Sequence, residues 1–264
     1  MRLVDIGANL VSRQFISDRE AVLDRARAAG VERMIVTGTR LDVSEDAVAL
    51  AEASDGLWAT AGVHPHHASE WDSQVSVRIE ELCARDAVVA VGECGLDFNR
   101  NYSPQVDQRR AFEAHLEIAA RAGLPVFLHQ RDAHAEFLAT LRNAWGSLGG
   151  GAVVHCFTEG PEEANDYLEL GCHLGVTGWV CDERRGGALR DAVREMPAER
   201  MLLETDAPYL LPRTIQPKPA TRRNEPMHLP WVVREIAAIR GEDANDIAAK
   251  SWETTHAFFA LPLV

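Results

Sequence analysis

Residues 88–97, VVAVGECGLD, decide how the rest of the chain is interpreted. Four apolar residues run into Gly92, and the carboxylate of Glu93 follows directly. A short run of mainly β-branched residues is typical of a strand buried on both faces, as in a parallel sheet. A charged residue at the carboxyl end of such a strand is unusual. Glu93 is therefore a candidate functional residue.

Three further apolar runs end in the same way, and the polar residues that follow them include His129, His155 and Asp206. In barrels of alternating strands and helices, catalytic groups lie at the carboxyl ends of several different strands. We therefore expect these three residues and Glu93 to converge on one point. Two carboxylates and two imidazoles form a set of ligands suited to a divalent metal ion.

Eight strand–helix units can be assigned along the chain, and the expected strands lie at 3–6, 34–36, 58–63, 88–92, 125–128, 152–154, 173–176 and 201–203. A last helix is expected at about 243–259. This pattern predicts an α/β fold of the (β/α)8 TIM-barrel type, and 264 residues suit one such barrel. We expect a single domain over residues 1–264.

The net charge of −13 predicts an acidic, well-solvated surface. It argues against non-specific coating of nucleic acid and leaves a local basic site open. Five cysteines without a C-x-x-C pair suggest neither a disulfide framework nor a zinc ribbon. The sequence shows no signal-peptide pattern and no apolar run of membrane-spanning length, so we expect a cytoplasmic protein without membrane association.

Two of the cysteines, Cys94 and Cys156, directly follow Glu93 and His155. They could be metal ligands or small buried side chains. Strand alternation directs neighbouring side chains to opposite faces, which favours burial.

The segment 207–227 is long, rich in proline and basic in an acidic chain. Four cations stand against one carboxylate, a net charge of +3, and these residues are Arg213, Lys218, Arg222, Arg223 and Glu225. Long loops without secondary structure are often functional. The segment could be a solvated surface loop, or it could clamp a phosphate beside the metal.

Other polar residues also follow expected strands. His64 and His66 come after the third strand, where they could ligate a metal, bind a phosphate or serve as satisfied polar groups. Arg131 lies two residues beyond His129 and could pair with Asp132 or hold a phosphate.

Motifs spread over nearly the whole chain carry a resemblance to the TatD family of metal-dependent deoxyribonucleases. They are DIGANL at 5–10, GVHPH at 62–66, GECGLD at 92–97, HQRD at 129–132, HCFT at 155–158, GWVCDERRG at 178–186, ETDAPY at 204–209 and RRNEP at 222–226. The resemblance implies a barrel of the metal-dependent hydrolase type.

The same resemblance implies an activity, a 3′→5′ exonuclease on single-stranded DNA with RNA as a second candidate substrate. It favours Mg²⁺, with Mn²⁺ or Zn²⁺ as alternatives. It implies metal ligation by the four residues selected above, and catalytic roles for Asp206, Glu93 and His64, with Asp206 accepting the proton of water. The expected substrate-binding residues are His64, His66, Arg131, Glu204, Arg222 and Arg223.

One departure concerns the first strand. Many members of the family carry His-x-His there, whereas this chain has Gly7 and Asn9. Glycine offers no side-chain ligand, and an amide binds zinc weakly. We therefore expect one tightly held ion, with a second ion weak or recruited with the substrate.

Two other functions remain open at this stage. One is hydrolysis of an ester or amide, such as that of a D-aminoacyl-tRNA. The other is a non-catalytic binding protein that has lost its metal, against which the intact ligand set speaks. We expect the chain to be a monomer.

Overall fold

The computed structural model describes residues 1–262, and eight parallel strands form its centre. They follow one another in chain order around the sheet: β1 (Leu3–Ala8), β2 (Val31–Val36), β3 (Leu57–Ala61), β4 (Val88–Asp97), β5 (Val126–Arg131), β6 (Ala152–Val154), β7 (His173–Val176) and β8 (Met201–Leu203). A parallel bridge between Ala8 of β1 and Ala207, in the segment that follows β8, joins the end of the sheet to its beginning. The predicted (β/α)8 barrel is confirmed.

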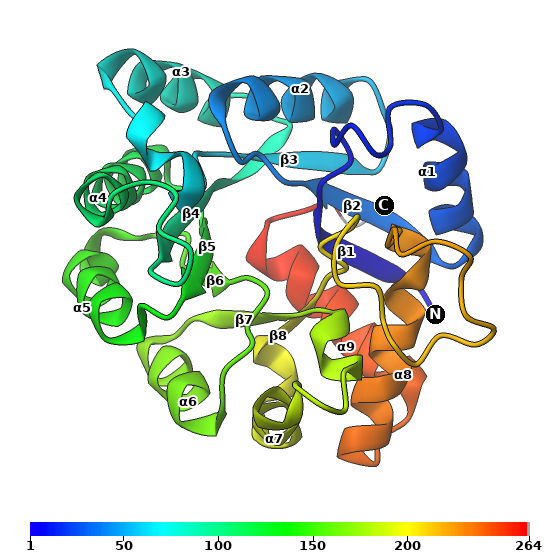
Figure 1. Ribbon diagram of the computed structural model, residues 1–264. Helices are drawn as coiled ribbons and strands as arrows, with labels where there is room; N and C mark the ends of the chain where they lie inside the picture. The colour runs from blue at the N-terminus through cyan, green and yellow to red at the C-terminus, as the bar shows by residue number, and fades with distance from the viewer. Residues whose placement is uncertain (263–264) are drawn as a thin grey trace.

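Helices surround the strands on the outside (Figure 1). The α-helices within residues 1–262 are α1 (Arg19–Ala28), α2 (Leu41–Glu52), α3 (Ser73–Cys83), α4 (Gln105–Ala122), α5 (His134–Ala144), α6 (Pro161–Leu170), α7 (Gly187–Glu195), α8 (Leu229–Arg240) and α9 (Ala244–Phe258). Short 3-10 helices are η1 (Pro65–Glu70), η2 (Trp145–Ser147), η3 (Gly178–Cys181), η4 (Ala198–Arg200) and η5 (Pro226–His228).

Local sequence signals set several helix ends. Asp72 caps α3, because its carboxylate accepts hydrogen bonds from the backbone N–H groups of Gln74 and Val75. Helix α4 ends at Gly123, whose left-handed conformation suits a residue without a side chain. Both helix ends are therefore fixed by residues adjacent to the helix in the sequence.

Two layers of apolar side chains hold the fold together. The larger layer lies between the strands and the surrounding helices. A smaller cluster fills the barrel, and it includes Phe127 and Leu202 together with Phe259 and Leu261 from the end of the chain. Burying a side chain such as Phe127 contributes about 1.5–3 kcal/mol. Helix α9 and the residues after it therefore close one end of the barrel (Figure 1).

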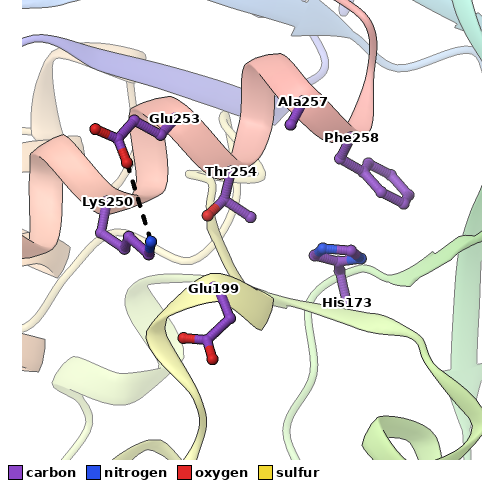
Figure 2. A pocket seen from close by; sticks show the side chains of 7 residues that line it. All are labelled: His173, Glu199, Lys250, Glu253, Thr254, Ala257 and Phe258. Carbon is purple, nitrogen blue, oxygen red and sulfur yellow. Dashed lines mark ion pairs between the residues drawn. The ribbon is translucent and has the colours of Figure 1, made fainter.

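A cavity of about 390 Å³ lies at this closed end (Figure 2). It is lined by His173, Glu199, Lys250, Glu253, Thr254, Ala257 and Phe258. His173 is the first residue of β7, so the cavity belongs to the amino ends of the strands. The candidate site residues lie at the carboxyl ends, which makes the cavity separate from them.

Strand β4 is longer than predicted, since it continues past Gly92 to Asp97 and pairs with β5 as far as Arg131. The strand was predicted to end at Gly92 because glycines and charged residues follow in 92–97, and such residues are typical of a strand end. In the structure the glycines allow β5 to approach. A Cβ atom at Gly95, where φ is +139°, would lie 2.0 Å from the carbonyl oxygen of His129.

Within residues 1–262, no helix has both the length and the apolar character needed to cross a membrane.

The close approach at Gly95 gives a stability prediction. Gly95→Ala should destabilise the protein by about 2–6 kcal/mol, because it combines a strained positive φ with a collision against the β5 backbone. Urea unfolding of both proteins measures the difference. Gly187→Ala is the control, since a Cβ atom there meets nothing within 4 Å. Equal stability losses in the two variants would contradict the explanation.

Candidate active site

Glu93 lies at an irregularity in strand β4. Gly92 pairs with Phe127 and Cys94 pairs with Leu128, so Glu93 is an extra residue in the β4 ladder. Bulges of this kind redirect a side chain and are frequent beside active sites. The backbone N–H of Glu93 donates to the Gly38 carbonyl at 2.7 Å. The side chain of Glu93 is consequently held at the carboxyl end of the barrel.

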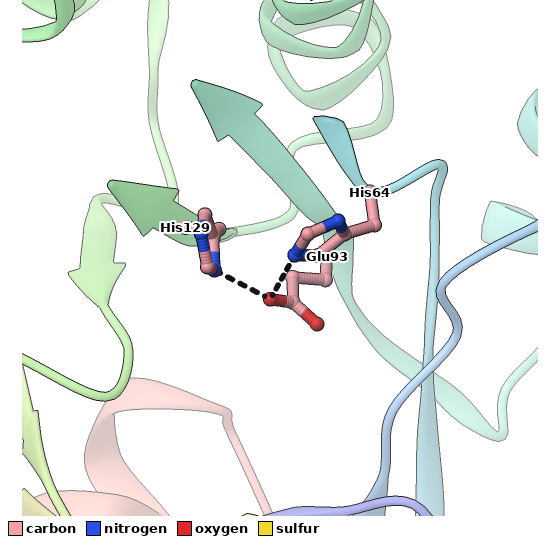
Figure 3. A group of neighbouring side chains, drawn as sticks. All are labelled: His64, Glu93 and His129. Carbon is pink, nitrogen blue, oxygen red and sulfur yellow. Dashed lines mark hydrogen bonds and ion pairs between the residues drawn. The ribbon is translucent and has the colours of Figure 1, made fainter. Parts of the chain in front are cut away.

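One oxygen of Glu93 meets three imidazoles. Its Oε1 lies 2.8 Å from His155 Nε2, 3.0 Å from His129 Nδ1 and 3.3 Å from His64 Nε2. Figure 3 shows His64 and His129 turned toward the same carboxylate oxygen. The three histidines belong to the ends of different strands. The structure thus brings together the predicted ligands Glu93, His129 and His155, and places the ring of His64 beside them.

The charges in this cluster are strongly coupled. Burial alone would raise the pKa of Glu93, but the nearby imidazoles of His155 and His64 bring it well below its ordinary value. Burial likewise opposes charge on His155, but Glu93 and Glu204 raise its pKa well above the usual range. Glu93 is therefore an anion at neutral pH.

His64 differs from the other two histidines. Burial lowers its pKa well below the ordinary value, although Glu93 opposes the shift. The backbone N–H of His66 donates to His64 Nδ1 at 3.0 Å, so the proton of the neutral ring is on Nε2. This assignment makes the Nε2–H of His64 a hydrogen-bond donor directed at the site.

Asp206 follows strand β8 and is held next to the first strand. Its backbone N–H donates to the Gly7 carbonyl at 2.8 Å, and Asn9 Nδ2 donates to its Oδ1 at 3.0 Å. Burial raises the pKa of Asp206 to about 7, and the positive charge of His155 opposes this shift. Asn9, which the sequence suggested only as a poor ligand, orients this carboxylate.

Glu204 does not lie where a substrate-binding residue would lie. Its side chain has no exposed surface, its Oε2 is 3.1 Å from His155 Nδ1, and its Oε1 accepts from the backbone N–H of Cys156. Glu204 was expected to contact the substrate. It instead contacts Nδ1 of His155, the ring nitrogen opposite the one that lies near Glu93. A carboxylate in this position fixes the orientation and tautomer of an imidazole.

Gly7 and Gly175 make room for this carboxylate. A Cβ atom at Gly7 would lie 2.4 Å from Glu204 Oε2, and one at Gly175 would lie 2.3 Å from Glu204 Oε1. A histidine at position 7 would have to displace Glu204. The absence of His-x-His at the first strand thus agrees with the structure, in which Glu204 occupies the space that a side chain at position 7 would need.

The residues present fit a divalent metal ion. Ligand atoms of His64, Glu93 and His129 lie within 4.8 Å of one another. His129 Nε2 is buried without a hydrogen-bond partner, and its distance of 3.6 Å from Asp97 Oδ2 is too long for one. A carboxylate facing several imidazoles is a typical donor set for such ions.

Outside this centre lie two other expected binding residues. His66 Nε2 is 2.7 Å from Asp97 Oδ2, which fixes the ring. Arg131 is exposed at the end of β5, while Asp132 accepts a hydrogen bond from Asn99 at 2.6 Å. Asp97 was given no role from the sequence, although a second carboxylate four residues after Glu93 was a visible signal.

The two arginines of the basic loop have different environments. Arg223 Nη2 lies 2.7 Å from both Asp18 Oδ2 and Glu225 Oε1, and its guanidinium covers the ring of Phe15. Its charge is therefore already compensated, and its contacts tie the loop to the segment before α1. Arg222 is exposed and forms no ion pair among residues 1–262.

The two cysteines of the motifs pack as small side chains. Cys94 is fully buried in the outer apolar layer. Cys156 is half-buried, with its Sγ 3.8 Å from Thr177 Oγ1. Burial raises the pKa of both thiols well above the ordinary value. The charge of Glu93 adds to this rise for both thiols, and the charges of Asp206 and Glu204 add to it for Cys156, so Cys156 lies near the cluster as a neutral thiol.

A barrel with carboxylates and imidazoles at the carboxyl ends of its strands defines a metal-dependent hydrolase. The family described as TatD related DNase matches residues 4–260. The protein named 3'-5' ssDNA/RNA exonuclease TatD from Pectobacterium carotovorum subsp. carotovorum is 52% identical over 260 residues, covering 98% of this chain and 100% of that protein. A protein of the same name from Cronobacter sakazakii is 54% identical over 241 residues, 91% of each chain.

The crystal structure of YJJV, a TatD homolog from Escherichia coli K12, has a TM-score of 0.91 and 31% identity, and the match covers 99% of both chains. The chain belongs to the TatD related DNase family. It is accordingly an enzyme, a hydrolase that depends on a divalent metal and acts on nucleic acid.

The contacts of Glu204 lead to a prediction. Glu204→Gln keeps the shape but places an amide donor against either His155 or the Cys156 N–H, so His155 loses its fixed orientation. Metal affinity and turnover should fall by about 10–100-fold with the fold retained. Calorimetric metal titration and circular dichroism measure the two effects. Glu117→Gln, on an exposed face of α4, is the control and should leave both unchanged. Unaltered metal affinity in Glu204→Gln would refute the positioning role.

Proposed function

We propose that the protein is a metal-dependent exonuclease that removes nucleotides from the 3′ end of single-stranded DNA, with RNA as a second substrate. The names of the relatives from Pectobacterium and Cronobacter support this direction and strand preference. The structural observation that carries the proposal is the single Glu93 oxygen faced by three imidazoles at the carboxyl end of the barrel.

Glu93, His129, His155 and Asp206 would hold the ion, with Mg²⁺ favoured and Mn²⁺ or Zn²⁺ as alternatives. The contacts of Glu93 with both histidines support this set. Asp206 is near enough for Glu93 and His155 to influence its pKa. We infer one tight ion per chain, because Glu204 occupies the space beside Gly7 and Asn9 is engaged with Asp206.

When bound, the ion supplies Lewis-acid chemistry: it neutralises charge on the scissile phosphate and makes a water molecule more acidic. Asp206 accepts the proton of the attacking water, and Asn9 holds the carboxylate in place for this transfer. His64 donates its Nε2–H to a phosphate oxygen, for which the neutral tautomer is suited. This argument favours phosphate binding over metal ligation for His64.

The substrate backbone would contact His66, Arg131 and Arg222. The exposure of the two arginines supports this assignment. We no longer include Arg223 among the substrate-binding residues, because its guanidinium is paired with Asp18 and Glu225. Phosphate contacts of this kind fix position and supply affinity without reading the base sequence.

The proposed activity is tested with a single-stranded oligonucleotide labelled at its 5′ end and incubated with Mg²⁺. Digestion from the 3′ end produces a ladder of progressively shorter labelled products. Early release of the labelled nucleotide would instead show the opposite polarity. Hydrolysis of a D-aminoacyl-tRNA without any cleavage of the oligonucleotide would replace the proposal by ester hydrolysis.

Glu93→Gln tests the metal assignment. The substitution preserves shape and removes the charge around which the imidazoles gather, so turnover should fall by more than about 100-fold, beyond the usual effect of supporting residues. Calorimetry should find one tight site per chain in the unmodified protein and none in the variant. Glu169→Gln, exposed on α6, serves as the control. Near-normal turnover of Glu93→Gln at low metal would reject the assignment.

The two arginines of the loop form a matched pair. Arg222→Ala should weaken DNA binding and lower the salt slope of the association constant by about 1, because one phosphate contact is lost. Arg223→Ala should mainly reduce stability, since it removes one of the two guanidiniums that pair with Asp18 and Glu225, the other being that of Arg25. Titration at several salt concentrations and thermal unfolding separate the effects. If Arg222→Ala and the unmodified protein have the same salt slope, Arg222 is a solvated surface residue that does not contact the substrate.

Three further expectations belong to the proposal. We infer that residues 1–264 fold as one domain, which the matching of the family to residues 4–260 supports. We also infer that the enzyme acts as a monomer in the cytoplasm. The five free thiols are compatible with the reducing conditions of that compartment.

A further inference from the structure

A row of aromatic rings leads from the centre of the site to the surface. The ring centroids of His129 and His64 are 4.4 Å apart, those of His64 and His66 are 4.2 Å apart, and those of His66 and Tyr102 are 4.7 Å apart. The inner rings contact Glu93 and Asp97. The outermost ring, Tyr102, is 67% exposed. The row therefore ends in an aromatic side chain that is open to solvent next to the site.

From this row we propose that Tyr102 is a base-stacking platform, which binds a nucleobase of the single-stranded substrate while its phosphates lie at the metal centre. The inference rests on the proposed nuclease function and adds the part of the substrate that Tyr102 recognises. Its contact with His66 is edge-on, with an angle of 68° between the rings. Such a contact engages at most one face of the phenol ring, and Tyr102 as a whole remains 67% exposed.

The backbone beside Tyr102 is firmly anchored. The buried Ser103 donates from its hydroxyl to the His66 carbonyl at 2.9 Å and accepts from the Ser69 N–H at 3.0 Å. Its own carbonyl accepts from Gln108 Nε2 at 3.0 Å. Tyr102 is therefore an exposed ring on a fixed support. Little conformational freedom would be lost when a base stacks on it.

Charge around the ring suits a nucleotide. The guanidinium of Arg100 lies 6.0 Å from the centroid of the Tyr102 ring, within the range of a weak cation–π contact. Arg100 is exposed and can meet the phosphate that accompanies a stacked base. An aromatic face beside a cation is the combination that proteins use to bind single strands without reading their sequence.

The location of exposed aromatic residues supports the choice of Tyr102. Among the large apolar residues that are exposed in residues 1–262, the aromatic ones are Tyr102 and Tyr209. Tyr102 lies between β4 and α4, and Tyr209 follows β8, so both loops leave the end of the barrel that carries the site. Tyr209 is outside the row of histidines, whereas Tyr102 is part of it.

A stacking platform also accounts for a preference for single strands. An unpaired base presents a free π-face to the phenol ring. In a duplex the same face is covered by neighbouring base pairs, and exposing it requires unstacking. The preference would then arise from access to the base and not from a hydrogen-bond pattern.

The test compares two probes, an oligothymidylate and an oligomer of the same length in which the nucleotides at the 3′ end are abasic. Binding is measured by fluorescence anisotropy with the metal chelated, so that no turnover occurs. Tyr102→Ala should weaken binding of the oligothymidylate by about tenfold, the usual scale for loss of one stacked base, and leave the abasic oligomer unaffected. Tyr102→Phe, which keeps the ring, should bind both probes as the unmodified protein does.

Val106→Ala provides the matched control, because Val106 is also 67% exposed and lies on the following helix. It should change neither affinity. Equal weakening of both probes in Tyr102→Ala, or no weakening of either, would overturn the platform. The nuclease function is tested separately by cleavage of an oligonucleotide. If Tyr102→Ala weakens binding only of the oligothymidylate but the unmodified protein cleaves no oligonucleotide, the stacking platform is supported and the nuclease function is rejected.

Discussion

The site depends on the burial of one charged carboxylate at the end of the barrel. Glu93 is only 6% exposed, and an unpaired charge in such a place costs several kcal/mol, a large part of the net stability of a typical domain, about 5–15 kcal/mol. His129 and His155, whose pKa values are raised, compensate this charge, and the neutral ring of His64 faces the same oxygen, so that three other strand ends meet Glu93. The barrel must therefore hold the ends of β3 to β6 at a fixed spacing, so that these side chains meet at one oxygen of Glu93.

Small residues make this arrangement possible. Gly92 and Gly95 let β5 approach β4 closely enough for His129 to reach Glu93. Gly7 and Gly175 leave space for Glu204, which supports His155 from behind. In each case the missing side chain is replaced by a neighbouring backbone or carboxylate oxygen. Positions that offer no chemistry of their own thus determine where the proposed ligands lie.

Much of the fold and the centre of the site was predictable. Apolar runs followed by Glu93, His129, His155 and Asp206 identified the strands and the polar residues at their carboxyl ends, because a buried strand has few reasons to end in a charge. The predictions were weaker where a role depends on distant partners. Glu204 was expected at the substrate and lies behind His155, and Arg223 is engaged by Asp18, which is remote in sequence.

The sequence by itself determined the order of strands and helices, the barrel class and the residue types at the strand ends, since these follow from local periodicity and from residues adjacent in the chain. Only the tertiary structure decided which carboxylate faces the site, which arginine is free to meet a phosphate, and that Tyr102 continues the row of histidines. Those properties depend on distances between strand ends and loops. Such distances are set by side-chain packing and by the register of β4 against β5, which no local pattern encodes.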